Sequence, residues 1–389
     1  MLKTKVCIIG AGPAGIAASL FLSRSGIEHV MVDRDVFPRH KVCGECYDGR
    51  VTRILNEVDP ELIPTMLKEN IIQYTDHYTL LKSSGRVFEI ISKMRNRVSR
   101  IQTERWYFDN FLLKYAQKSS HLQFFDNQTV VEIEKGSNEF TIKTRANALE
   151  ISADFLLMAC GSDSLLTQHF LNDIRPESPN RFIFERLYYQ LKEPFPNNSV
   201  TIHYCVKPFA HAIVLCPTPG NKVNIELAVD KESFQRFKPD MSQMIRNFLA
   251  GNQLEKSIFQ GAEEIYKPRG ASMTLHNPAI SFEGDRYLII GDAAFCSNPL
   301  AGLGVGQAMT MGKIAALQVA DCFKNGVFNK NYEVDFDRTI RKRFSKEIQQ
   351  GKFITFMFKS PFLMNKLFAI VTFSPRFSRY LTKLLSLFF

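Results

Sequence analysis

The sequence lacks the features that mark several protein classes. It holds one tryptophan, and its eight cysteines are scattered rather than spaced as a disulfide framework, which predicts a reducing compartment. No stretch approaches the roughly 18 uninterrupted apolar residues of a membrane-spanning helix. The first residues lack the basic leader, apolar core and cleavage site of a signal peptide. From these absences we expect a cytoplasmic location.

The composition and net charge indicate the class of protein and its possible partners. Apolar residues make up 45% and charged residues 23%, as in a globular protein with a large core. The net charge of +10 would suit nucleic acid, anionic lipid or acidic ligands. No nucleic-acid-binding motif accompanies this charge, so we expect no nucleic-acid partner.

The chain opens with a βαβ pattern. Residues 5–10 predict a buried parallel strand, residues 13–24 a helix and residues 29–33 a second strand. Between the first strand and the helix lies the turn GAGPAG, residues 10–15. Its glycines allow a tight turn and close approach to a pyrophosphate, whose charge the helix N-terminus stabilises. Asp33 ends the second strand where a ribose-binding acid is needed, so this unit predicts a dinucleotide site.

A second glycine-rich motif lies near the end of the predicted fold. Residues 291–294 read GDAA, and Pro299, Gly302, Gly304 and Gly306 follow. This pattern resembles the GD motif of the flavoprotein hydroxylase superfamily (group A monooxygenases). The resemblance implies that Asp292 bonds the ribityl chain and that the glycines bring a helix N-terminus to the flavin edge. Because NAD has no ribityl-flavin end, the motif favours FAD.

A third motif falls on a helix predicted over residues 103–118. Arg105, Asp109 and Leu112 resemble the R-x-x-F-D-x-x-L helix of the same superfamily, which implies that Arg105 lies beside FAD. An ion pair between residues i and i+4 of a surface helix explains the spacing equally well.

A fourth motif, PRHKVCGE at residues 38–45, resembles the R-x-K-x-C-G-E segment of the geranylgeranyl reductase branch, whose enzymes saturate isoprenoid double bonds. The resemblance implies that this loop runs along the flavin, with Cys43 near the isoalloxazine ring as a candidate catalytic residue. The same resemblance implies that Arg39, Lys41, Gly44 and Glu45 also lie near the flavin.

Cys43 and Cys46 also form a C-x-x-C pair. A zinc site needs a second ligand pair, and the sequence offers none, so we expect no metal. A dithiol that exchanges electrons with the flavin is the alternative to chance spacing. We favour chance, and expect Cys46→Ser to leave turnover intact.

The sequence departs from the branch patterns at three places. Cys160-Gly161 stands where the hydroxylases have Asp-Gly with a later Arg, which places direct reduction by NAD(P)H in question and makes a separate reductase the other electron source. Only Pro217 remains of the reductase motif Y-x-W-x-F-P. The single tryptophan, Trp106, excludes the halogenase motif W-x-W-x-I-P.

The predicted fold class is α/β. We expect a Rossmann-type FAD-binding domain of the glutathione-reductase kind, an inserted antiparallel β-sheet substrate domain and a helical C-terminal tail. The boundaries are 1–175 for the FAD domain, with a substrate-domain strand pair near 71–92; 176–275 for the substrate domain; 276–329 for the return to the FAD domain; and 330–389 for the tail. Residues 122–150 predict an antiparallel layer, and a long helix begins near Gly304.

The predicted protein is an FAD-dependent oxidoreductase acting on an apolar small molecule or a lipid-like substrate. We rank monooxygenation through a C4a-hydroperoxyflavin first and reduction of a carbon–carbon double bond second. A flavin halogenase and a non-catalytic FAD-binding scaffold follow. Residues expected to bind the cofactor are Gly10, Gly12, Pro13, Ala14, Gly15, Asp33, Arg34, Arg39, Lys41, Cys43, Gly44, Arg105, Gly161, Gly291, Asp292, Pro299, Gly302, Leu303 and Gly304.

The tail from residue 353 alternates Phe and Leu with Lys and Arg. One interpretation is a peripheral membrane contact, with apolar rings among the headgroups and basic groups at lipid phosphates. The other, which we favour from sequence alone, is a helical lid on the substrate domain or a dimer contact.

Overall fold

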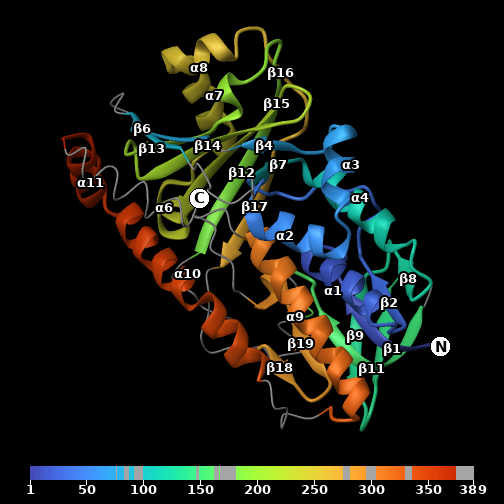
Figure 1. Ribbon diagram of the computed structural model, residues 1–389. Coiled ribbons are helices and arrows are strands. Elements are labelled where there is room, and N and C mark those ends of the chain that lie inside the picture. Colours follow the sequence, from blue (N-terminus) through green and yellow to red (C-terminus); the bar gives the residue numbers. More distant parts are fainter. Residues whose placement is uncertain are drawn as a thin grey trace.

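The computed structural model describes residues 1–75, 77–82, 87–91, 100–145, 149–161, 166, 181–274, 281–294, 304–328 and 335–373. Predictions that fall on Pro299, Gly302 and Leu303, and on the tail after residue 373, lie outside the described residues. The chain forms two large β-sheets, one above the other in Figure 1, with the C-terminal helices running along one side of both.

The first sheet is mainly parallel. Its strands β19, β11, β1, β2 and β8 lie in this order, and each pairs in parallel with its neighbour. The antiparallel strand β18 borders β19, and the β9–β10 pair borders β11. The bounds are β1 (Leu2–Ile9), β2 (His29–Val32), β8 (Leu122–Phe125), β9 (Val130–Lys135), β10 (Phe140–Thr144), β11 (Glu150–Met158), β18 (Glu283–Gly284) and β19 (Tyr287–Ile289).

One strand direction was predicted wrongly. Leu122–Phe125 was expected in the antiparallel layer of residues 122–150, but β8 pairs in parallel with β2. The rest of that stretch, β9 and β10, is antiparallel. A four-residue strand carries no mark of its direction, because side chains alternate in the same way in both kinds of sheet.

The second sheet is antiparallel except for one parallel pair, β5 with β13. Its order is β16-β12-β15-β14-β13-β5-β6, and β17 pairs with the free part of β12. The predicted strand pair near residues 71–92 is β5–β6, and it joins this sheet. The bounds are β5 (His77–Lys82), β6 (Val87–Ile91), β12 (Arg181–Gln190), β13 (Val200–Cys205), β14 (His211–Thr218), β15 (Lys222–Asp230), β16 (Glu263–Glu264) and β17 (Arg269–Thr274).

A small third sheet contains β3 (Cys46–Tyr47), β7 (Arg100–Gln102) and β4 (Gln73–Thr75). The helices are α1 (Pro13–Arg24), α2 (Gly49–Val58), α3 (Leu62–Lys68), α4 (Arg105–Ala116), α6 (Lys231–Phe237), α7 (Met241–Gly251), α8 (Gln253–Ile258), α9 (Gly304–Asn325), α10 (Phe336–Lys359) and α11 (Pro361–Phe373), with short 3-10 turns η1 (Pro196–Asn198) and η2 (Gly291–Ala294). The described part of the tail is helical, as predicted.

Helices α1 and α9 cross closely beside the first sheet. A side-chain carbon at Gly312 of α9 would overlap the carbonyl oxygen of Ala14 in α1. A side-chain carbon at Gly291, in η2, would lie 2.9 Å from the Cβ of Ala14. The close packing therefore brings the two glycine-rich motifs, more than 270 residues apart in sequence, to the same end of α1.

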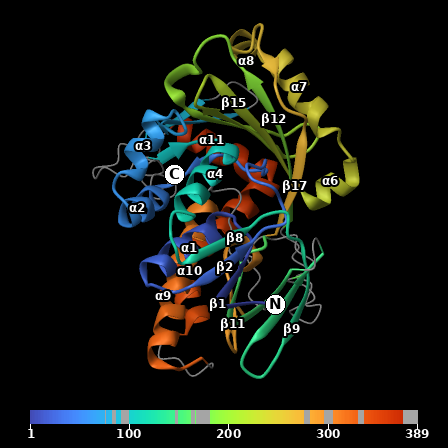
Figure 2. The ribbon, with the colours of Figure 1, turned by 90° about the vertical axis from the view of Figure 1, so that its right-hand side faces the viewer.

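The two faces of the second sheet have different partners (Figure 2). The outer face, with Leu187, Leu215 and Ile225, packs in one apolar cluster with Ile245 and Leu249 of α7. The inner face faces the loop after β2 and the C-terminal helices. Its apolar side chains cluster with side chains of α10 and α11; the buried members are Phe182, Phe184, Tyr204, Ala210, Ala212, Ala228, Phe358 and Phe368.

Candidate functional site

The glycine-rich turn joins β1 to α1. Gly10 has φ +106°, in the region that favours glycine, and α1 begins at Pro13, a position that needs no backbone N–H. The Ala11 N–H donates to Asp33 Oδ2 at 2.6 Å, and the Asp35 N–H donates to Oδ1 at 2.9 Å. The Asp33 carboxylate therefore holds the turn in place, a role that the sequence did not reveal.

The turn is packed tightly from both sides. A side-chain carbon at Gly15 would overlap the carbonyl oxygen of Gly10. A side-chain carbon at Gly10 would overlap the Ala159 carbonyl oxygen and lie 3.2 Å from Cys160 Cα. The residues that follow β11 thus lie against the turn, and Gly161, the next residue along, has φ +85°.

Asp33 is buried, and burial raises the pKa of its carboxyl, while Arg39 and the two backbone N–H groups oppose this rise. Each carboxylate oxygen has a further lone pair beyond the one used by a backbone N–H. Asp33 therefore keeps the capacity to accept a ribose hydroxyl as predicted. Arg34, next in the chain, is exposed.

Arg39 has hydrogen-bonding capacity to spare beside the turn. Its Nη2 lies 3.8 Å from the place of a side-chain carbon at Gly12. Nη1 is 3.4 Å from Asp109 Oδ2, Nε is 3.7 Å from Asp35, and the guanidinium lies over the Phe37 ring. Nε and Nη1 are nevertheless buried without a hydrogen bond. Arg39 therefore has N–H donors without partners, and it lies beside the glycine-rich turn and the N-terminus of α1. These groups are suited to bind the negatively charged pyrophosphate of FAD.

Arg105 forms the ion pair within α4 that its spacing allows. Its Nε and Nη2 donate to the two oxygens of Asp109 at 2.7 and 2.5 Å. Asp109 is 1% exposed and also faces Arg39. Asp109 thus holds the side chain of Arg105, the predicted cofactor neighbour. Arg39 and Arg105 both lie beside the Asp109 carboxylate.

Lys41, an exposed residue, lies within electrostatic reach of Asp292 although the two are 251 positions apart. Desolvation lowers the pKa of Lys41, and the positive charges of Arg105, Arg39 and Arg34 act in the same direction, whereas Asp292 opposes them. The loop of residues 38–45 and the GD motif are therefore within electrostatic reach of each other. Gly304 begins α9 close by in sequence; Pro299, Gly302 and Leu303 lie outside the described residues.

The sequence did not predict the buried network around Glu45. Glu45 has φ +61° and is 1% exposed. Its Oε1 accepts the Arg105 N–H at 3.1 Å and Arg186 Nη1 at 3.3 Å, and the Tyr188 hydroxyl donates to Oε2. Burial raises the pKa of Glu45 to about 8, although Arg186 and Tyr188 oppose this rise. Glu45 thus ties the loop to β12.

A second carboxyl group, Glu226 on β15, lies beside the same loop. It pairs in register with Arg186 on β12, and its Oε1 is 3.9 Å from the place of a side-chain carbon at Gly44. Asn224, on the same face of β15, donates to the Cys43 carbonyl at 2.8 Å. Burial raises the pKa of Glu226 to about 7, opposed by Arg186. Burial also raises the pKa of the Cys43 thiol.

Aromatic rings pack around His40 of the loop. His40 lies 4.4 Å from the Trp106 ring and 4.8 Å from the Tyr266 ring, and Tyr266 meets Tyr188 edge-on at 5.1 Å. The Tyr266 hydroxyl donates to Glu104 at 3.4 Å. The sole tryptophan therefore packs at the start of α4, against the loop that carries the fourth motif.

The two cysteines of the C-x-x-C pair have different neighbours: the Cys43 carbonyl accepts from Asn224, whereas Cys46 contacts other groups. The Cys46 sulfur lies 2.9 Å from the Tyr78 hydroxyl, and a hydrogen bond with Cys216 lowers the pKa of Cys46. Cys46 therefore faces the second sheet. All cysteines of the described ranges are free thiols, and the described side chains contain no group of three His, Cys, Asp or Glu residues that would hold a metal ion.

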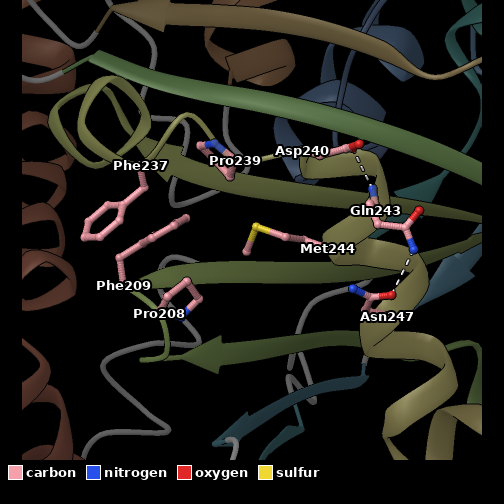
Figure 3. A pocket seen from close by; sticks show the side chains of 8 residues that line it. All are labelled: Pro208, Phe209, Phe237, Pro239, Asp240, Gln243, Met244 and Asn247. Atoms are coloured by element: carbon pink, nitrogen blue, oxygen red, sulfur yellow. Dashed lines mark hydrogen bonds between the residues drawn. The ribbon is translucent and has the colours of Figure 1, made fainter.

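Two other features lie apart from this loop. His203 Nε2 is 2.8 Å from Glu255 Oε1, but the pair is buried beneath α8 on the outer face of the sheet. A hollow of about 340 Å³ is lined in part by Phe209 and Phe237, whose ring centroids lie 4.9 Å apart. Figure 3 shows the side chains that line it. Its polar side chains cap or bridge α7, as Asp240 does with the Gln243 N–H at 2.9 Å. Neither feature contacts the residues predicted for the cofactor.

The fold and the site together define an FAD-dependent oxidoreductase. The sequence profile described as "FAD binding domain" matches residues 3–311, and the chain belongs to this family. The predicted likeness to the flavoprotein hydroxylase and geranylgeranyl reductase superfamily, and the predicted α/β fold class, are thereby confirmed. The family establishes FAD as the cofactor; it leaves the electron source undetermined.

Relatives in this superfamily are distant but similar over most of their length. An uncharacterized protein of Methanosarcina barkeri is 25% identical over 90% of this chain and 81% of its own. The menaquinone reductase of Mycobacterium tuberculosis is 24% identical over 80% of this chain and 75% of its own. A pyrrole-carbonyl carrier-protein chlorinase of Pseudomonas fluorescens is 21% identical over 98% and 88%.

Solved structures share the fold. A flavoprotein/dehydrogenase of Cytophaga hutchinsonii has a TM-score of 0.79 at 19% identity, covering 99% of this chain and 92% of its own. A geranylgeranyl bacteriochlorophyll reductase-like protein of Thermoplasma acidophilum has a TM-score of 0.79 at 16% identity, covering 92% and 88%.

Proposed function

We propose that this flavoprotein reduces a carbon–carbon double bond in an apolar, lipid-like substrate. The observation that carries the proposal is the pair of carboxyl groups, Glu45 and Glu226, on the side of the Cys43-Gly44 loop that faces the second sheet. We therefore favour reduction over the monooxygenation that the sequence alone ranked first.

Saturating a double bond requires a hydride at one carbon and a proton at the other. Bound reduced FAD supplies the hydride. Glu226 supplies the proton, because its pKa of about 7 leaves much of the carboxyl protonated at neutral pH. The partly buried side chain lies next to Gly44, where the loop has no side chain to separate them.

Arg186 positions both carboxyl groups. It bonds Glu45 at 3.3 Å and faces Glu226 across the β12–β15 pair. When Glu226 releases its proton, the guanidinium stabilises the carboxylate that forms. Glu45 and Tyr188 hold Arg186 in turn, since Arg186 Nη1 also contacts the Tyr188 hydroxyl at 3.1 Å.

The surroundings favour an apolar substrate. The inner face of the second sheet changes from polar at Arg186 and Glu226 to apolar at Phe184 and Ala228, two residues further along the same strands. Val42, from the cofactor loop, packs in this apolar cluster. The names of two similar proteins, a menaquinone reductase and a geranylgeranyl bacteriochlorophyll reductase-like protein, are consistent with an isoprenoid substrate class.

We propose further that electrons come from a separate donor protein rather than from direct contact with NAD(P)H. The support is the Cys160-Gly161 pair, which lies at the glycine-rich turn without the acid and the later arginine of the hydroxylase pattern.

Product analysis under two atmospheres tests the proposed reaction. The FAD-loaded protein is incubated with geranylgeranyl diphosphate, whose reducible groups are carbon–carbon double bonds, either with dithionite under nitrogen or with NADPH and a generic flavin reductase in air. We expect a product heavier by two hydrogens under nitrogen. A product heavier by one oxygen, formed only in air, would establish monooxygenation instead.

A further inference from the structure

We propose that the exposed face of α10 and α11 binds the surface of a lipid bilayer that contains anionic lipid. This surface consists of Phe353 and Phe356 on α10, Phe362 and Ile370 on α11, and the basic side chains around them. The proposal does not depend on which reaction the flavin site performs.

The apolar side chains of this surface are unusually open to solvent. Phe353 and Phe356 are each 63% exposed, Phe362 is 64% exposed and Ile370 is 48% exposed. Single exposed apolar residues are ordinary, but Phe353 and Phe356 lie one turn apart on α10, and Phe362 and Ile370 follow on the next helix. Concentrations of exposed apolar side chains mark contacts with a partner or with a membrane.

The same helices are already held to the protein by other residues. Phe344, Phe358 and Phe368 are buried, and the Tyr204 hydroxyl donates to the Phe358 carbonyl at 2.9 Å. Arg50 binds Glu347 of α10 at 2.8 Å. Other side chains therefore dock α10 and α11, and a lid function does not account for the exposed faces of Phe353, Phe356 and Phe362.

Charge identifies the partner as an anionic surface. The exposed basic side chains of the two helices are Arg338, Lys342, Arg343, Lys346, Lys352 and Lys366. The acidic side chains of α10, Asp337 and Glu347, are each neutralised by an arginine. Lys366 lies 4.4 Å above the Phe362 ring, so its charge sits at the rim of the apolar patch. Apolar rings with basic groups at their edge suit the headgroup region of an anionic bilayer.

A second copy of the chain is the less suitable occupant. A face-to-face dimer through this surface would bring the same unpaired lysines and arginines together, and like charges across an interface disfavour association. Anionic headgroups would instead neutralise them.

The two helices meet at a sharp bend. The break between the helices, at Ser360, bends the pair by 103°. Among the residues described, no single helix is long and apolar enough to cross a membrane, and only this bent pair meets the criteria of length and composition.

Flotation of the full-length, FAD-loaded protein with vesicles tests the proposal. The vesicles are phosphatidylcholine alone or phosphatidylcholine mixed with phosphatidylglycerol. We expect flotation with the mixed vesicles and weak flotation with phosphatidylcholine alone, because the basic side chains need anionic headgroups. The double variant Phe353→Ser/Phe356→Ser should reduce the bound fraction at least about tenfold.

A matched control removes two exposed apolar side chains elsewhere. Leu254 and Val131 are 54% and 47% exposed, and Leu254→Ser/Val131→Ser should float as the wild type does. Flavin absorbance and thermal melts confirm that each variant is folded. Equal flotation of the wild type and the Phe353/Phe356 variant, or no flotation with either vesicle, would overturn the proposal. A wild-type dimer in gel filtration that the Phe353/Phe356 variant dissociates would also overturn it.

Discussion

Arg186 and Glu226 face each other across β12 and β15, and both lie against the loop that carries Cys43 and Gly44. Arg186 also bonds Glu45 of that loop, so one guanidinium contacts the loop and faces the carboxyl group of the sheet. The Arg186–Glu45 bond thus connects two parts of the proposed site. One is the second sheet, where we expect the substrate, and the other is the loop of residues 38–45, where we expect the flavin.

The first prediction concerns the acid. Replacing Glu226 with Gln keeps the shape but removes the transferable proton, so we expect the reduction rate to fall by about 10²-fold or more with FAD retained. In the wild type, the rate should decline as pH rises through about 7, since the protonated form is the active one. The pH–rate profile of both proteins measures this. The exposed Glu263 provides the control variant Glu263→Gln, and an equal loss there would contradict the assignment.

The second prediction concerns the stability contributed by Glu45. Its pKa is raised from 4.5 to about 8 on folding, so the folded state holds a proton that the unfolded state releases. Stability should therefore fall as pH rises between these values and level off above about 8. Glu45→Gln has no carboxyl group to titrate at this position. The melting temperature of the variant minus that of the wild type should therefore increase as pH rises from 4.5 to about 8. A difference between the two proteins that stays constant with pH would show that Glu45 is charged in the folded state.

The third prediction concerns close packing at the glycine-rich turn. A methyl group at Gly15 would overlap the Gly10 carbonyl, so Gly15→Ala should lower FAD affinity by at least about tenfold, because the turn must move to admit it. Gly251 has open space around it and an ordinary backbone conformation. Gly251→Ala should therefore keep wild-type affinity. Fluorescence titration of the apoprotein with FAD compares the two, and equal affinity for both variants would argue against the packing role of Gly15.

The fourth prediction concerns the unused donors of Arg39. Arg39→Ala should weaken FAD binding by about one to two orders of magnitude, the effect of losing a charged hydrogen bond of about 1.5–3 kcal/mol. Arg53, an exposed residue of α2, offers the control Arg53→Ala. Calorimetric titration measures both, and unchanged affinity of the Arg39 variant would remove Arg39 from the cofactor site.

The fifth prediction concerns Cys46. Its sulfur contacts Tyr78, and Cys46→Ser supplies a hydroxyl that can make the same hydrogen bond. Turnover should stay within about twofold of the wild type, as expected for a thiol outside the redox path. Loss of turnover with full flavin content would instead establish a dithiol role.

The sequence predicted structural elements whose ends are marked by residues close together in the chain. Residues 13–24 form α1 as expected, because a proline at the first position and a glycine after the last turn mark both ends. The pairing of Glu45 with Arg186, and the approach of Glu226 to Gly44, join positions far apart in the chain. Strand register decides these contacts, and no local pattern encodes it, so the acid of the proposed reaction was missed. Arg186 and Glu226 lie on strands predicted in advance, but charged residues on strands are usually exposed.

Rapid mixing without oxygen tests the central claim most directly. The FAD-loaded protein is photoreduced and mixed under nitrogen with geranylgeranyl diphosphate, and flavin absorbance is followed together with the mass of the product. The account predicts that this substrate reoxidises the flavin without oxygen and gains two hydrogens, and that Glu226→Gln slows this step while Glu263→Gln does not. Flavin that stays reduced with geranylgeranyl diphosphate under nitrogen, and that reoxidises only in air with an oxygen atom added to the product, would contradict the account.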